Sequence, residues 1–117
     1  MSEGLMLVYG WGPEEDGRLS SLLYMAETAL AMGIKTSIFL YTDAAILAKK
    51  GNIQKISGEI FSRFQRIAND PNLGLYVCEE AAKKRAINTE NLEEKLSLIG
   101  YATFLDMATK IKTVITI

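Results

Sequence analysis

Five short apolar runs alternate with segments of helical periodicity along the chain. The first run, LMLVY at residues 5–9, is apolar at every position, which is typical of a strand buried on both faces of a sheet. Similar runs at residues 36–41, 73–77 and 113–117 are predicted as strands, and residues 96–99 as a short strand or the start of a helix.

Between these runs, apolar side chains recur at the spacing of one helical face. Helices are predicted over residues 19–30, 44–50, 57–68, 79–85 and 101–111. Gly33 and Gly51 stand where the first two helices should stop, and Ser57 is a candidate N-cap of the third. Strands that alternate with helices in this way predict a parallel sheet covered by helices on both faces.

Composition indicates a single domain over residues 1–117. The 117 residues are 49% apolar and 23% charged, which suits one soluble globule with one core. The net charge of −1, with Lys and Arg spread along the chain, provides no basic patch for nucleic acid. The chain begins MSEG, with no positive segment before its apolar run, and no stretch approaches the ~20 apolar residues that span a bilayer. We expect a cytoplasmic protein that binds neither nucleic acid nor membrane.

The lack of histidine and the single cysteine limit the kinds of active site that the chain can build. The chain has no His and one Cys, so it cannot build a Ser-His-Asp or Cys-His pair, and it has too few soft ligands for a zinc or iron–sulfur site. One cysteine also cannot close an intrachain disulfide. The chemical partner of Cys78 is therefore expected on another molecule.

Ligands of open parallel sheets gather outside the carboxyl ends of the strands, and the loop at residues 10–17 falls there. Its glycine spacing suggests a phosphate-binding loop, but Arg18 and a leucine stand where Lys and Ser/Thr are needed, and three consecutive acids would repel phosphate. A dinucleotide fingerprint would need a third glycine after Gly10 and Gly12. The loop is therefore predicted to shape the rim of a site or an interface.

Two further residues belong to the same edge of the predicted sheet. Trp11, the only tryptophan, is either an exposed contact residue or a plug of the loop, and a plug is the simpler interpretation. Asp43 follows the second strand and is most simply an N-cap of the short helix after it, although its position also suits a site.

Cys78 stands where the third strand ends and a charged helix begins, and two interpretations are open. It is either a small buried hydrophobe or a thiolate favoured by the free N–H groups and dipole of the helix N-terminus. Arg85 lies seven residues on, about two turns and nearly the same helical face. Glu79 and Glu80 oppose a thiolate with adjacent negative charge.

The segment LYVCEEAAKKRAI, residues 75–87, resembles the DsrE/DsrF-like (TusD-like) sulfur-relay family, in which a strand delivers a cysteine to the start of a helix. The resemblance covers nearly the whole chain, through the opening strand with its Gly-rich loop, LLYMAETALAMG, IKTSIFLYTDAAILAKKG and GYATFLDMATKIKTVITI. By position, Cys78 matches the persulfide-carrying cysteine of the family and Arg85 the arginine after it. Ala86 departs from the pattern because many members have Gly there, and CEE replaces a more polar or small-residue turn.

The resemblance implies a three-layer α/β/α sandwich with a five-stranded, mostly parallel sheet, assembled as a homotrimer or homohexamer. It implies a possible sulfurtransferase in which Cys78 accepts sulfane sulfur from a donor protein and passes it to an acceptor protein. No metal or organic cofactor is required. Arg85 would stabilise the anionic sulfur, and the remaining implied positions line the approach to it: Gly10, Trp11, Gly12, Asp43 and Glu79.

Two alternatives stand beside this hypothesis. In the first, the chain is a non-catalytic oligomeric adaptor or small-ligand-binding protein in which Cys78 is structural. In the second, Cys78 is the peroxide-reactive residue of a one-cysteine reductase that uses an external reductant.

Overall fold

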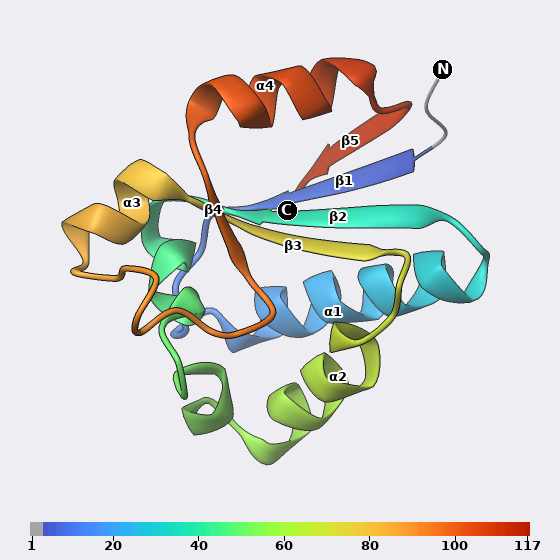
Figure 1. Cartoon of the computed structure of the whole chain (residues 1–117). Coiled ribbons are helices and arrows are strands. Elements are labelled where there is room, and N and C mark those ends of the chain that lie inside the picture. The colour runs from blue at the N-terminus through green and yellow to red at the C-terminus, as the bar shows by residue number, and fades with distance from the viewer. Residues whose placement is uncertain (1–3) are drawn as a thin grey trace.

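The computed structural model describes residues 4–117, so the expectation drawn from the first three residues lies outside the described part of the chain. Its strands form one five-stranded sheet in the order β4-β3-β2-β1-β5, and every pairing is parallel (Figure 1). The strands are β1 (Gly4–Tyr9), β2 (Lys35–Leu40), β3 (Leu73–Cys78), β4 (Ser97–Ile99) and β5 (Thr113–Thr116). The predicted five-stranded parallel sheet is confirmed, and residues 96–99 contribute a strand.

Helices cover both faces of this sheet. The α-helices are α1 (Asp16–Ala31), α2 (Gly58–Ala68), α3 (Glu79–Lys84) and α4 (Tyr101–Lys110), and the short 3₁₀ helices are η1 (Thr42–Ala48) and η2 (Ile53–Lys55). In Figure 1, α1 and α2 lie on one side of the sheet and α4 lies on the other, while α3 extends from the edge where β3 ends. The predicted three-layer α/β/α sandwich is therefore confirmed.

The strand register decides which side chains face which layer. Leu7, Ile38 and Leu75 are aligned across three strands and pack toward α1 and α2. The next row includes Phe39 and faces the opposite way, because successive side chains of a strand point to opposite faces. The Phe39 ring stacks on Phe104 of α4 with 4.1 Å between centroids, so this second row is the α4 face.

Several predicted helix ends are present. Gly33 and Gly51 have φ angles of +79° and +87°, a left-handed conformation that glycine adopts without steric cost. The Ser57 hydroxyl accepts a hydrogen bond from the Ile60 N–H at 3.1 Å, which caps α2 as predicted.

The predicted role of Asp43 as an N-cap is wrong. The 3₁₀ helix η1 begins one residue earlier, with Tyr41 in the capping position, so Asp43 lies within its first turn. A carboxylate inside the turn is free to pair with another element, and Asp43 does so with Arg85.

No helix within residues 4–117 is long and apolar enough to cross a membrane. In the same part of the chain, no cluster of three or more Cys, Asp or Glu side chains is arranged to hold a metal ion.

Candidate functional site

Cys78 is the last residue of β3 and the N-cap residue of α3. The Tyr76 position is paired with Phe39, whose ring packs on α4, so Cys78, two residues further along the strand, points to the same face of the sheet. The side chain is a free thiol and is 1% exposed. The sulfur thus lies at the carboxyl edge of the sheet, but it is buried.

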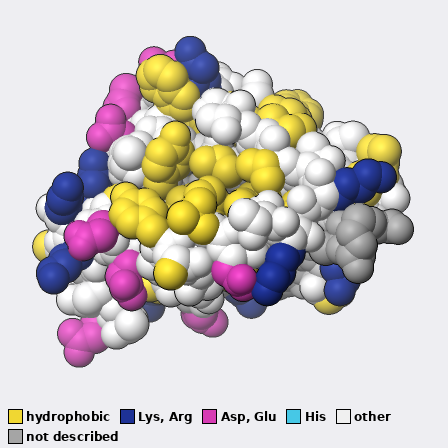
Figure 2. All heavy atoms as spheres, turned by 90° about the horizontal axis from the view of Figure 1, so that it is seen from above, with side chains coloured by type: hydrophobic (Ala, Val, Ile, Leu, Met, Phe, Trp, Pro, Cys, Tyr) yellow, Lys and Arg dark blue, Asp and Glu magenta, His cyan; other side chains and the backbone are white. Residues whose placement is uncertain are grey.

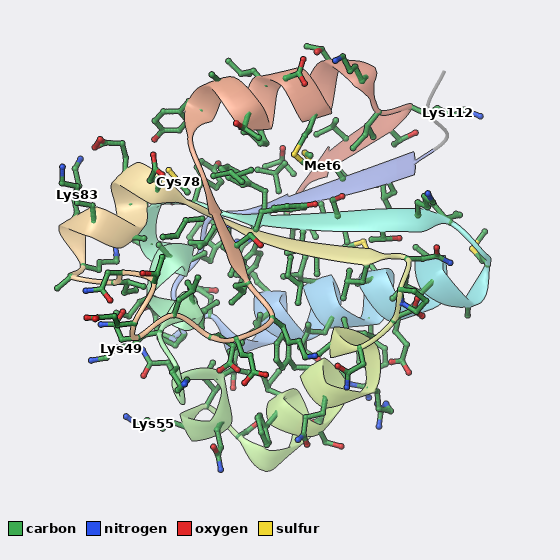
Figure 3. The ribbon with its side chains drawn as sticks, in the orientation of Figure 1. Met6, Lys49, Lys55, Cys78, Lys83 and Lys112 are labelled. Carbon is green, nitrogen blue, oxygen red and sulfur yellow. The ribbon has the colours of Figure 1, made fainter. Side chains whose placement is uncertain are left out.

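Tyr101 lies over this sulfur. Cys78 is paired with Ile99 of β4, Gly100 is the N-cap of α4, and Tyr101 is the first residue of that helix. Figure 3 shows Cys78 beneath this end of α4. Interaction with the Cys78 side chain raises the pKa of Tyr101 above its ordinary value, and desolvation and the charge of Glu80 raise it further.

Glu79 and Glu80 form the first turn of α3. Both are exposed, and negative side chains there complement the positive end of the helix dipole. The Glu79 carboxylate reaches toward the start of α4, where its Oε1 is 3.5 Å from the place a Cβ would occupy on Gly100. Glu79 therefore lies beside the start of α4.

Arg85 pairs with Asp43 at the other end of α3. Its Nη2 is 2.9 Å from Asp43 Oδ1, and its Nη1 donates to the carbonyl of Ala81 at 3.0 Å. The helix ends at Lys84, so Arg85 is its C-cap and does not continue along the Cys78 face as the spacing suggested. Within residues 4–117, no hydrogen bond or ion pair joins Arg85 to Cys78.

Three of the predicted rim residues, Gly10, Trp11 and Asp43, share an open hollow of about 410 Å³ at the ends of β1, β2 and β5. Trp11 is 41% exposed, with the Arg18 guanidinium 4.1 Å from its ring centroid. The interpretation of Trp11 as a loop plug is wrong, because the cation stacks on a ring that stays open to solvent.

The two glycines of this loop serve different purposes. A Cβ on Gly10 would come within 2.9 Å of the Tyr41 ring, so glycine permits the two loops to approach. A Cβ on Gly12 would meet the Glu14 carboxylate, which lines a different hollow beside η1 and η2. Gly12 is therefore not one of the residues around the Trp11 hollow.

The family of the chain follows from a match over nearly its whole length. The model of the DsrE/DsrF-like family matches residues 4–117. The chain belongs to this family. Among curated proteins, an uncharacterized protein of Methanocaldococcus jannaschii, MJ0760, is 38% identical over 89 residues, which are 74% of this chain and 32% of that protein. The chain spans about a third of the length of this relative.

Solved structures show the same fold. The ychN protein from E. coli aligns with a TM-score of 0.77 and 16% identity, covering 98% of this chain and 99% of that one. MTH1491 from Methanobacterium thermoautotrophicum, a protein of unknown function, aligns with a TM-score of 0.70 and 8% identity, covering 95% and 99% of the two chains. These likenesses confirm the DsrE-like architecture.

The departure from the DsrE/DsrF-like pattern at Ala86 has a backbone consequence. Ala86 has φ +56°, and two hydrogen bonds, from Ala86 N–H to Lys83 O and from Ile87 N–H to Ala82 O, form a Schellman motif at the end of α3. Glycine suits this position because it has no Cβ to strain the left-handed conformation. In this chain alanine holds that conformation.

Tyr101 is the residue at this DsrE-like site that sequence reasoning missed. The pattern assigned it to the apolar stripe of a helix. Its position in the sequence could have indicated a place at the site. Tyr101 comes one residue after a short strand, and the carboxyl ends of parallel strands meet at one edge of the sheet.

Proposed function

We propose that this protein is a sulfur carrier in which Cys78 accepts sulfane sulfur as a persulfide and passes it to a partner protein. The observation that carries the proposal is the placement of the cysteine, at the junction of β3 and α3 in a chain of the DsrE/DsrF-like family. The proposed partners are a donor protein and an acceptor protein, with the cytoplasm as the compartment, where thiols stay reduced.

The proposed transfer has two balanced steps. The Cys78 thiolate attacks the outer sulfur of a donor persulfide, the donor S–S bond breaks, and the donor leaves as a thiolate. An acceptor thiolate then attacks the outer sulfur of the Cys78 persulfide, and Cys78 leaves as a thiolate. Neither step changes the total oxidation state, so the cycle uses no metal, organic cofactor or external reductant.

Intact mass spectrometry tests this function. We expect incubation with glutathione persulfide to add about 32 Da per sulfur atom to the folded protein, and Cys78→Ser to take up none. Dithiothreitol should then remove the added mass from the wild type. A wild type that gains no mass while free cysteine in the same buffer does would reject the proposal.

The burial of Cys78 favours a second function, a non-catalytic adaptor or small-ligand-binding protein in which the thiol only packs. The two functions differ in alkylation. A carrier thiol reacts with iodoacetamide in the folded protein, whereas a packing thiol reacts only after denaturation. In the second case, the Trp11 hollow becomes the candidate binding surface.

The proposal gives Arg85 an electrostatic role at a distance from the sulfur. Its guanidinium places positive charge at the end of α3, and Asp43 both orients and partly neutralises that charge. We further propose that the residues around the Trp11 hollow contact the partner protein as it approaches.

We also propose assembly into a homotrimer or homohexamer through the side of the molecule that carries α4. No residue of α4 is buried, and all four residues of β5 are exposed. Figure 2 shows hydrophobic side chains gathered on this side. Leu105 of α4 and Val114 of β5 are exposed apolar residues. An apolar surface of this kind is typical of an interface between protein chains.

Sedimentation tests the assembly. Leu105→Glu and Val114→Glu should dissociate the oligomer, whereas Met32→Glu, an exposed apolar residue at the far end of α1, should leave it intact. A monomeric wild type at micromolar concentration would rule the assembly out.

A further inference from the structure

We propose that the Trp11 hollow is a binding site for a small monocarboxylic acid with an aromatic or other apolar body, in which Arg18 binds the carboxylate. The inference goes beyond the proposed sulfur transfer, because no part of it uses Cys78. Neither the family match nor the likeness to solved structures assigns a ligand to this hollow.

The topology of the sheet places the hollow where open parallel sheets bind ligands. The strand order is β4-β3-β2-β1-β5, so β1 lies between β2 and β5. The connection from β1 to β2 runs through α1 on one face of the sheet, whereas the connection that reaches β5 runs through α4 on the other face (Figure 1). Residues at the ends of all three strands line the hollow. It therefore lies outside the carboxyl ends of the strands at which the connections change face, which is the general ligand position in such sheets.

The Arg18 side chain is arranged to bind an anion. Its guanidinium lies 4.1 Å from the centroid of the Trp11 ring, and its Nε is 3.3 Å from Glu15 Oε1. Within residues 4–117, its two terminal nitrogens make no hydrogen bond or ion pair. Stacking on the indole and the contact with Glu15 together limit the orientations of the guanidinium. The free Nη1 and Nη2 can then donate to both oxygens of one carboxylate.

The charges around the hollow favour a ligand with a single negative charge. Arg18 is paired with Glu15, and Asp43 is paired with Arg85 at 2.9 Å, so these four groups carry no net charge. Asp16 lines the neighbouring hollow beside η1 and η2 and adds negative charge nearby. A doubly charged phosphate would meet one guanidinium and an excess of carboxylates, which repel it. A carboxylate satisfies the guanidinium without a second charge.

The walls of the hollow belong to two loops that are held close together. The Thr42 hydroxyl donates a hydrogen bond to the Gly10 carbonyl at 3.0 Å. Thr42 has φ +47°, an outlier for a β-branched residue, and backbone strain of this kind is concentrated at functional sites. The half-buried Tyr41 ring stacks on Phe39 with 6.1 Å between centroids. The Tyr41 and Trp11 rings, which both line the hollow, therefore provide fixed aromatic surface for the body of a ligand.

The size of the hollow agrees with an acid of this class. Its volume of about 410 Å³ is within the range of small-molecule sites. Acetate would pair with Arg18 but leave the aromatic rings uncovered, whereas phenylacetate would cover them as well. Because buried apolar area adds to affinity, phenylacetate is expected to bind more tightly than acetate.

The single tryptophan of the chain reports on binding directly. The indole N–H of Trp11 gives one side-chain resonance in a proton–nitrogen correlation spectrum, and its position is followed during titration of the folded protein. The probes are sodium phenylacetate, its uncharged analogue phenylacetamide, sodium acetate and inorganic phosphate. We expect phenylacetate to shift the resonance saturably with a Kd on the order of 1 mM, as suits an open site, and the other three to bind roughly tenfold more weakly.

Variants of two similar arginines test the role of Arg18. Arg18→Lys keeps the positive charge and removes the planar fork, whereas Arg18→Gln removes both, so phenylacetate binding should weaken roughly threefold and tenfold. Arg66→Gln is the matched control, because Arg66 is about as exposed as Arg18 and its Nε is likewise 3.3 Å from a glutamate, but it lies on α2. Arg66→Gln and Cys78→Ser should bind phenylacetate as the wild type does.

Failure of this inference is distinguishable from failure of the carrier function. The inference is wrong if phenylacetate at about 10 mM, ten times the expected Kd, leaves the Trp11 resonance in place. It is also wrong if another probe binds as tightly as phenylacetate, or if Arg18→Gln binds it as tightly as the wild type. Uptake of sulfur on Cys78 tests the carrier function separately. A wild type that binds phenylacetate but takes up no sulfur would reject the carrier function alone.

Discussion

The two faces of the sheet are packed very differently. On one face, α1 buries five side chains and α2 buries three, nearly all of them in a continuous apolar core. On the other face, α4 buries none, and the adjoining edge strand β5 is exposed along its whole length. One sheet thus has a closed face, covered by α1 and α2, and an open face, covered by α4 alone.

The two faces therefore have different roles: the closed face contributes most to stability, and the open face carries Cys78. The closed face removes the most apolar area from water, which is the main favourable contribution to folding. The Cys78 side chain points to the open face, on the side of α4. A cysteine on the closed face would need the core to open before it could react, whereas on the open face one helix end is enough.

The largest effect should come from a cavity on the closed face. Leu22 of α1 is 1% exposed, and Leu22→Ala should lower the free energy of unfolding by about 3 kcal/mol, the usual cost of a leucine cavity. Urea denaturation measures this. The control Met32→Ala, at the 70% exposed C-cap of the same helix, should change it by less than about 0.5 kcal/mol. Equal losses in the two variants would mean that the closed face does not dominate stability.

A cavity on the open face should cost less but change the chemistry. Phe104 is half-buried and stacks on Phe39, so Phe104→Ala should lower the free energy of unfolding by about 2 kcal/mol. It should also speed alkylation of Cys78 in the folded protein, because α4 is then held less firmly over the sulfur. Leu22→Ala should leave the alkylation rate unchanged under native conditions. Faster alkylation in both variants would show that global unfolding, and not movement of α4, exposes the thiol.

A buried tyrosine extends the comparison to alkaline pH. Tyr9 is fully buried, and burial, followed by the charge of Glu15, raises its pKa to about 12. A raised acid pKa stabilises the fold below the ordinary value of 10.0, and this stability is lost as the pH rises from there toward about 12.

Urea denaturation at pH 9, 10 and 11 checks this expectation with Tyr9→Phe. The wild type should lose about 1 kcal/mol more than the variant between pH 9 and 11, since the variant has no proton to release. The contribution of other groups cancels in the difference. Parallel pH profiles for the two proteins would contradict the assignment to Tyr9.

Most of the fold was predictable, because each element is periodic over its own residues. The apolar runs of β1, β2 and β3 and the stripe of α2 are local patterns, and Ser57 and Gly33 mark helix ends by local chemistry. The DsrE-like segment around Cys78 also indicated the candidate site, since a short motif contains its own strand and helix.

The features that the sequence did not predict depend on contacts between residues that are separated along the chain. The partner of Arg85 is Asp43, 42 positions away, and nothing in the spacing of either residue predicts that contact. The approach of Tyr101 to Cys78 follows from the register of β3 with β4, which a three-residue strand does not encode by pattern. The stacking of Arg18 on the exposed Trp11 ring is also not indicated by the sequence pattern.

A substitution at the end of α3 is expected to stabilise the fold. Ala86→Gly should raise the free energy of unfolding by up to about 1 kcal/mol, because glycine adopts the left-handed conformation of Ala86 without the Cβ clash. The same substitution at Ala108, inside α4, should lower it by about 1 kcal/mol, as expected in a right-handed helix. A loss at both positions would mean that Ala86 is not strained.

The smallest effects on stability should come from breaking the ion pair between Asp43 and Arg85. Asp43 and Arg85 are partly exposed, so Asp43→Asn should change the free energy of unfolding by only about 0.5 kcal/mol, as should the control Asp106→Asn, which breaks the exposed pair with Lys110. Sulfur loading separates the two. If Arg85 favours the anionic sulfur by charge, Asp43→Asn should speed glutathione persulfide loading about twofold at low salt, because less of that charge is neutralised, and Arg85→Ala should slow it. Asp106→Asn should do neither. Changes of the same sign in Asp43→Asn and Arg85→Ala would instead make the pair a structural contact between η1 and α3 with no effect of its charge on Cys78.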